Sequence, residues 1–177
     1  MNVIKIRNAA SPEYVNEYAK KAIQKKKISS KIEKTKLEEI FIFSCSNIKL
    51  ALRVTNVGSL SNEYSSIFKA NLSNNTIFGF SFINNNLINI VNINYLINIP
   101  ISNNNKQIVE IYRGKIRIGI QIDANNYSVQ KVAIPFTSNY DTNYKYIEKV
   151  INLNNEPVFL IDESLLFSRI SKYIYIK

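Results

Sequence analysis

Hydrophobic and polar residues alternate with a period of two along most of the chain after Glu38. In segment 47–54 (NIKLALRV), every second residue is apolar and falls on one face of a strand, while Lys49 and Arg53 fall on the other. Similar short runs, bounded by Asn, Ser or Gly, occupy residues 38–45, 77–83, 87–93, 107–112, 115–122, 127–134, 146–152 and 157–161. This pattern predicts an all-β fold of the sandwich or barrel type.

The N-terminal segment has a different pattern. Within residues 11–34, Tyr14, Tyr18 and Ala22 recur at four-residue spacing, and Ser11 is placed to cap a helix. We therefore predict a basic helix and linker over residues 1–36, followed by one domain over residues 37–177.

The β-rich part contains an internal repeat. The stretch 85–97 reads NNLINIVNINYLI, and 70 residues later 155–167 reads NEPVFLIDESLLF. A shift of 68 residues places FSCSNIKLALRV (43–54) on IYRGKIRIGIQI (111–122). Two halves that each contain two hairpins indicate a duplicated small barrel, with lobes at about 37–97 and 107–167 that share an apolar seam. Whether the lobes exchange strands is left open by the sequence.

Composition narrows the chemistry. The chain has 177 residues, one cysteine and no histidine, so the commonest general base and metal ligand are missing. Cys45 cannot form an internal disulfide, which fits a reducing cytoplasm. The N-terminal residues resemble no secretory signal, and no apolar run is long enough to span a bilayer. We therefore expect no cofactor, no metal, no catalysis and no membrane insertion.

The formal net charge of +10 is unevenly distributed. Residues 1–36 contain ten Lys or Arg and three Glu, hence +7, and the remaining residues contain 13 basic and 10 acidic side chains, hence +3. The basic segment is centred on Lys20, Lys21, Lys25, Lys26 and Lys27. Charge of this kind is typical of a solvated helix, or of a surface that meets an acidic partner, lipid or nucleic acid.

Five blocks follow one another over some 130 residues: LALRV (50–54), IFGFSFINNNLINIVNI (77–93), GIQID (119–123), VAIP (132–135) and YIEKVINLNNEPVFLIDESLL (146–166). In this order and spacing they resemble the CheW-like coupling domain of bacterial chemosensory systems. The resemblance implies two five-stranded SH3-like barrels around a shared core. The chain departs from the family pattern at Asn84 and Asn85, where Arg-Gly is common, and this departure suggests a diverged system such as the pilus-type branch.

The resemblance further implies a non-enzymatic cytoplasmic adaptor at membrane-associated receptor arrays. It would couple the cytoplasmic tip of chemoreceptors to the regulatory domain of a histidine kinase. The candidate receptor-side residues are Phe80, Ile83, Asn84 and Asn85. The candidate kinase-side residues are Ile116, Ile118 and Gly119. Asp123 and Asp162 match acidic family positions, and we expect both to act as turn or helix caps.

Three other functions remain open from the residues alone. The Lys-rich segment could bind nucleic acid or an anionic surface, although no base-stacking motif is visible and we expect no nucleic-acid partner. A small enzyme on a β-barrel is disfavoured by the missing histidine and sparse glycine. A purely structural β protein is compatible with the same pattern.

Overall fold

The computed structural model describes residues 35–61, 67–69, 75–99, 106–135 and 145–174. The predicted helix at 11–34 and the lysines at 20, 21, 25, 26 and 27 lie outside the described residues.

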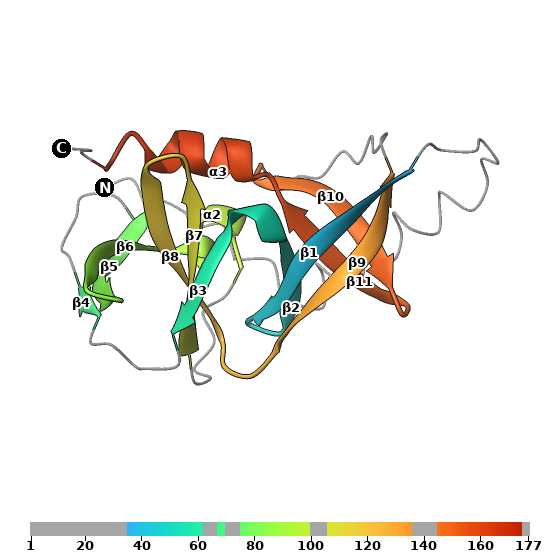
Figure 1. Cartoon of the computed structure of the whole chain (residues 1–177), viewed down its shortest axis with the longest axis horizontal. Coiled ribbons are helices and arrows are strands. Elements are labelled where there is room, and N and C mark those ends of the chain that lie inside the picture. The colour runs from blue at the N-terminus through green and yellow to red at the C-terminus, as the bar shows by residue number, and fades with distance from the viewer. Residues whose placement is uncertain (1–34, 62–66, 70–74, 100–105, 136–144, 175–177) are drawn as a thin grey trace, which may run out of the picture.

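The described chain is almost entirely β, which confirms the predicted fold class. The strands are β1 (Thr35–Cys45), β2 (Ile48–Arg53), β3 (Val57–Ser61), β4 (Phe68–Lys69), β5 (Ile77–Ile83), β6 (Asn86–Val91), β7 (Lys106–Arg113), β8 (Ile116–Asp123), β9 (Tyr127–Pro135), β10 (Ile147–Leu153) and β11 (Glu156–Ile161). The helices are the 3-10 turn η1 (Val54–Asn56), α2 (Ile93–Ile97) and α3 (Glu163–Ile170). Figure 1 shows two strongly twisted β lobes side by side, with α3 beside them.

Each sheet takes strands from both halves of the sequence. Sheet 1 has the order β10-β11-β2-β1-β9, and sheet 2 has the order β3-β7-β8-β6-β5-β4. The hairpin β1–β2 thus joins the strands of the second half, and the hairpin β7–β8 joins those of the first. Every consecutive hairpin is antiparallel, whereas β11 with β2 and β6 with β8 pair in parallel.

The two parallel strand pairs, one in each sheet, join equivalent positions of the internal repeat. Asn89 lies opposite Ile118 in sheet 2, and Phe159 lies opposite Leu50 in sheet 1. The 70-residue shift relates Asn89 to Phe159, and the 68-residue shift relates Leu50 to Ile118. The structure therefore contains the same parallel pairing twice, at positions that the internal repeat relates.

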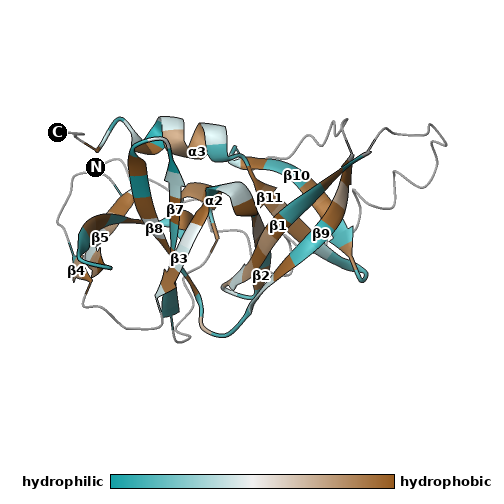
Figure 2. Ribbon diagram, in the orientation of Figure 1, coloured by the Kyte–Doolittle hydropathy of each residue, from teal (hydrophilic) through white to brown (hydrophobic). Residues whose placement is uncertain are grey.

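Three apolar clusters fill the fold. The largest joins both sheets and α3, and includes Phe43, Leu50, Ile111, Ile120 and Leu166. A second cluster lies in sheet 1 around Ile40, Ala51 and Leu160, and a third lies in sheet 2 around Ile83, Ile88, Ile90 and Ile108. Figure 2 shows hydrophobic positions along the strands and hydrophilic positions at turns such as that between β10 and β11. The shared seam predicted from the repeat is the largest cluster.

Asparagine provides the left-handed backbone at the hairpin turns. Asn84 and Asn85 have φ of 49° and 63°, and their counterparts Asn154 and Asn155 have φ of 51° and 65°. Asn tolerates positive φ better than most residues, because its short polar side chain can hydrogen-bond locally. These two-residue turns allow the sequence to form tight hairpins with few glycines.

Both halves end their second hairpin in a capped helix. Asn92 accepts a hydrogen bond from the N–H of Tyr95 (3.1 Å), and Asp162 accepts one from the N–H of Leu165 (2.9 Å). The cap predicted at Asp162 is confirmed. Sequence reasoning extended the strand through residue 93 and missed α2, because five residues carry little helical periodicity.

Candidate protein–protein interfaces

The candidate receptor-side residues surround the β5–β6 turn but differ in exposure. Asn84 and Asn85 are exposed at the turn, Phe80 is half-buried, and Ile83 is only 3% exposed and packs in the third cluster. Ile83 is therefore a core residue that supports the turn. The side chains available to a partner are those of Asn84, Asn85 and Phe80.

A chain of hydrogen bonds anchors this turn to the rest of sheet 2. The Asn84 amide donates to the Ser59 hydroxyl (3.1 Å), and the Ser59 hydroxyl donates to a Glu110 carboxylate oxygen (2.8 Å). Arg117 donates to the other oxygen of the buried Glu110 (3.2 Å). Hydrogen bonds to β3 and β7 thus hold the turn in place. The turn residues themselves, Asn84 and Asn85, carry no charge.

The candidate kinase-side hairpin β7–β8 buries two of its three predicted residues. Ile118 is 0% exposed and Gly119 is buried, whereas Ile116 is partly buried against the shared cluster. A Cβ atom on Gly119 would lie 2.7 Å from Ile90 Cδ1 and 2.8 Å from Ile108 Cγ2. Ile118 and Gly119 therefore belong to the core, because no partner can reach them in this fold. The hairpin presents Arg113, Gly114 and Lys115 to solvent.

The outer face of β4, β5 and β6 is apolar, which sequence reasoning missed. Phe68, Phe82 and Leu87 are 58%, 57% and 59% exposed. Phe82 pairs with Leu87 across β5 and β6, and Phe68 pairs with Phe80 across β4 and β5. We call Phe68, Phe80, Phe82 and Leu87 the aromatic face. Strict alternation in FGFSFI was its only signal in the sequence.

Charged side chains concentrate where β2 meets β10 and α3. The Arg53 guanidinium donates two hydrogen bonds of 2.9 Å to Glu148 and one of 2.8 Å to Glu38. The bonds to Glu148 raise the pKa of Arg53. Burial alone would raise the pKa of Glu38, but Arg53 outweighs burial and lowers it. This arrangement is a structural ion-pair network rather than a reaction centre.

The network borders a cavity of about 220 Å³ lined in part by Arg113, Asp162 and Glu163. Burial raises the pKa of Glu163, while the Arg53 backbone N–H (2.6 Å) and the Asn56 amide both donate to its carboxylate. The second acidic family position, Asp123, is buried and forms an ion pair with Lys106. Each of these carboxylates therefore has a structural partner.

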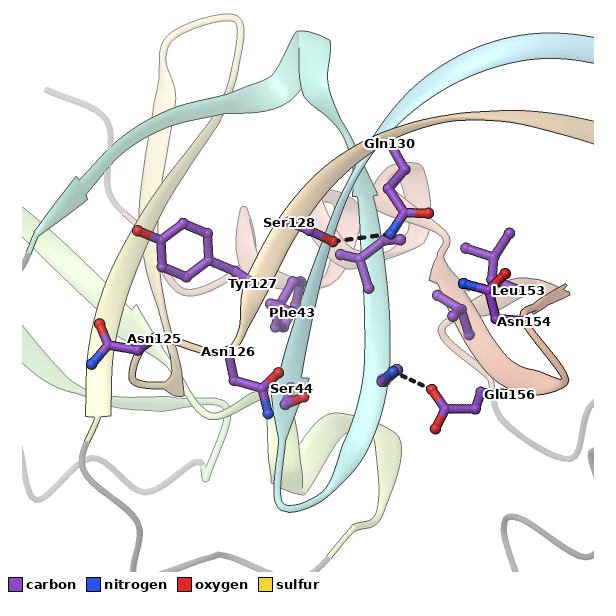
Figure 3. A pocket seen from close by; sticks show the side chains of 13 residues that line it. Phe43, Ser44, Asn125, Asn126, Tyr127, Ser128, Gln130, Leu153, Asn154 and Glu156 are labelled. Atoms are coloured by element: carbon purple, nitrogen blue, oxygen red, sulfur yellow. Dashed lines mark hydrogen bonds and ion pairs between the residues drawn. The ribbon is translucent and has the colours of Figure 1, made fainter.

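A second cavity, of about 240 Å³, lies at one end of sheet 1 (Figure 3). The side-chain amides of Asn125, Asn126 and Gln130 line this cavity. The Gln130 amide donates a hydrogen bond to the Ser128 hydroxyl (3.3 Å). The ion pair of Lys49 with Glu156 borders it. No nucleophile paired with a general base lines it. Within the described ranges, no group of three His, Cys, Asp or Glu residues is placed to hold a metal.

Comparison with known proteins identifies the architecture. No protein-family model and no curated protein matches the chain. Among solved structures, the scaffolding protein TtCheW from Thermoanaerobacter tengcongensis aligns with a TM-score of 0.57 at 17% identity, covering 75% of this chain and 93% of that one. The chain has the two-lobed, SH3-like all-β fold of a CheW scaffold. In the part of the chain that the structure describes, no helix is long and apolar enough to cross a membrane.

Proposed function

We propose that this protein is a non-enzymatic adaptor that couples chemosensory receptors to a histidine kinase. The observation that carries the proposal is the alignment of nearly the whole of a solved CheW scaffold with the two interleaved lobes. The absence of any nucleophile–base pair at the two described cavities supports it. The adaptor would act in the cytoplasm, at membrane-associated receptor arrays.

An adaptor of this kind needs two separate contact surfaces on a rigid body. Receptor state can bias the kinase only if the contacts differ between signalling states. We assign the receptor surface to the β5–β6 turn, where Asn84, Asn85 and Phe80 are accessible. We assign the kinase surface to the β7–β8 hairpin, with Ile116 at its edge and Ile118 and Gly119 supporting it from the core.

The neutral β5–β6 turn indicates to which branch of the chemosensory systems the adaptor would belong. The family pattern commonly has Arg-Gly where this chain has Asn84 and Asn85, so a receptor matched to the turn would need hydrogen-bonding groups rather than a carboxylate. A diverged chemosensory system, such as the pilus-type branch, fits this difference in polarity.

Direct binding tests the proposal. The full chain is titrated with the isolated regulatory domain of a chemosensory histidine kinase and, separately, with the cytoplasmic tip of a receptor from the same cell. We expect saturable binding of both, and a ternary complex when both are present. Failure to bind either partner would remove the basis of the adaptor assignment.

The internal repeat offers a matched control for the receptor surface. Asn85→Gly keeps the left-handed turn and removes the side chain, and Asn155→Gly makes the same change at the equivalent turn. We expect Asn85→Gly to weaken receptor binding about fivefold, the effect of losing one hydrogen bond, with kinase binding unchanged. Equal effects of the two variants would place the receptor elsewhere.

The concentration of positive charge in residues 1–36 favours an alternative, the binding of an anionic surface or nucleic acid. Such affinity would fall steeply with salt. Titration of duplex DNA and of anionic vesicles, with and without residues 1–36, tests this alternative. Salt-sensitive binding that disappears on deletion would assign this role to the basic segment.

A further inference from the structure

The aromatic face is an exposed apolar surface that no other described strand or helix covers. Along β5, Gly79, Ser81 and Ile83 are buried, so Phe80 and Phe82 lie on the opposite side, whereas Phe78 packs against the third cluster. Phe82 and Leu87 are direct cross-strand partners, and each keeps more than half of its surface exposed. A contiguous patch of exposed aromatic and aliphatic side chains is typical of a contact surface.

The two strands β5 and β6 are also free of charged residues. The sequence from Ala70 to Asn105 contains no Lys, Arg, Asp or Glu, although the whole chain carries a net charge of +10. Lys69 is adjacent in sequence, and its ammonium lies over the Phe78 ring, 5.7 Å from the ring centroid. Asn89, the cross-strand partner of Phe80, and the exposed turn residues Asn84 and Asn85 place amides beside this face.

These properties indicate which kind of molecule could bind the aromatic face. A partner selected to bind a strongly basic protein would present carboxylates, and the aromatic face offers them no cation. Two copies of a chain with a charge of +10 repel each other over most approaches. At this face no charged side chain of β5 or β6 adds to that repulsion. An Asn amide has both donors and an acceptor, so the amides beside the face can pair with the same amides of a second copy.

We propose that the aromatic face is a self-association surface, at which two copies of this chain meet face to face about a two-fold axis. In such an isologous contact the same residues serve on both sides, so Phe82 of one copy can pack against Leu87 of the other. The contact is small and apolar, so the association is weak and is strengthened by salt, which screens the repulsion between the basic bodies.

Sedimentation equilibrium of the full chain tests the proposal, over concentrations from about 10 µM to about 1 mM, a range suited to an interface of this size. We expect a monomer–dimer equilibrium whose dissociation constant falls severalfold between low and high sodium chloride. A chain that remains monomeric throughout, or an association that weakens with added salt, would overturn the proposal.

Two variants with the same change in charge locate the contact. Phe82→Lys places like charges across the two-fold axis, and Val129→Lys introduces the same charge at an equally exposed apolar position on β9 (59% exposed). We expect Phe82→Lys to abolish dimerisation and Val129→Lys to reduce it by less than about threefold, the effect of the extra charge alone. Circular dichroism verifies that both variants fold. Dimerisation that survives Phe82→Lys, or that both variants abolish, would contradict this location.

The same two variants separate this proposal from the adaptor function. Phe82→Lys lies outside the β7–β8 hairpin that we assign to the kinase, so it is expected to keep kinase binding while losing the dimer. An unsubstituted chain that binds kinase but remains monomeric up to about 1 mM would refute self-association and leave the adaptor function standing.

Discussion

Arg53, at the end of β2, binds both carboxylate oxygens of Glu148 on β10 through two hydrogen bonds of 2.9 Å. The two residues are 95 positions apart and belong to different halves of the internal repeat. Their pairing joins the hairpin of one half to the strands of the other, at the place where the halves interleave.

Removal of this guanidinium should destabilise the fold. The Arg53 and Glu148 side chains are more than two-thirds buried. Arg53→Ala leaves Glu38 and Glu148 with only their longer ion pairs, to Lys36 (3.4 Å) and to Lys149 (3.8 Å). We expect a loss of about 2 kcal/mol in the free energy of unfolding, since hydrogen bonds to charged groups contribute about 1.5–3 kcal/mol each and partial exposure reduces the effect. Urea denaturation measures the difference.

The control is the exposed ion pair between Lys49 and Glu156. Exposed pairs contribute little, so Lys49→Ala should change the free energy of unfolding by less than about 1 kcal/mol. Equal costs for the two variants would show that the Arg53 network adds nothing beyond surface attraction.

The Glu38 carboxylate should contribute a defined part of the acid sensitivity. Its folded-state pKa is lowered, so its contribution to stability is complete above the unfolded-chain pKa of about 4.3 and is lost as pH falls through the folded value. Glu163 has the opposite sign, because its pKa is raised and its cost is relieved on acidification. We expect Glu38→Gln to flatten the fall in unfolding free energy below about pH 5, measured by urea titrations at successive pH values. An unchanged slope would contradict the assignment.

Cys45 should be protected from thiol reagents in the native state. It is 0% exposed, its thiol donates to the Asn94 amide oxygen (3.3 Å), and burial raises its pKa to about 11. Labelling at pH 8 should therefore occur only on opening of the fold, and should accelerate at denaturant concentrations that unfold the chain.

The same thiol predicts an alkaline effect on stability. The folded chain retains the proton up to about pH 11, whereas the unfolded chain releases it near pH 9, so stability falls as pH rises between these values. Cys45→Ala should remove this component. Rapid labelling of native protein, or no difference between the two pH profiles, would show that the thiol is accessible.

Gly119 should be required for packing. A Cβ atom there would approach Ile90 Cδ1 to 2.7 Å, so we expect Gly119→Ala to lower the free energy of unfolding by about 1–3 kcal/mol, the usual cost of overpacking. Ile90→Val removes the Cδ1 atom. In a double-mutant cycle, Gly119→Ala should cost less in the Ile90→Val background, although the contact with Ile108 Cγ2 remains. Strict additivity would contradict this contact.

The hairpins and their turns could be predicted from the sequence because they are local. Alternation in segments such as NIKLALRV places apolar residues on one face, and paired asparagines supply the positive φ that a two-residue turn needs. The short helix α3 could be predicted from its cap at Asp162. The helix α2 could not be predicted, because its five residues fit the end of a strand equally well.

The candidate surfaces could be predicted only in part. Asn84 and Asn85 are exposed as expected for a turn, but alternation alone cannot show which face of a strand another element covers. No other described strand or helix covers the outer face of β5, so Phe82 is exposed, whereas Ile118 on β8 packs in the largest cluster and is fully buried. Ala51 shows the same limit, because β2 is central in sheet 1 and is buried on both faces.

The sequence by itself determined which segments form strands, where the chain turns and that the pattern occurs twice, since backbone sterics and the alternation of side chains act over a few residues. Only the tertiary structure decided that the halves exchange hairpins, that Arg53 reaches Glu148 and that Phe82 faces solvent. These features depend on parallel pairings between distant strands, β2 with β11 and β6 with β8, which no local pattern encodes.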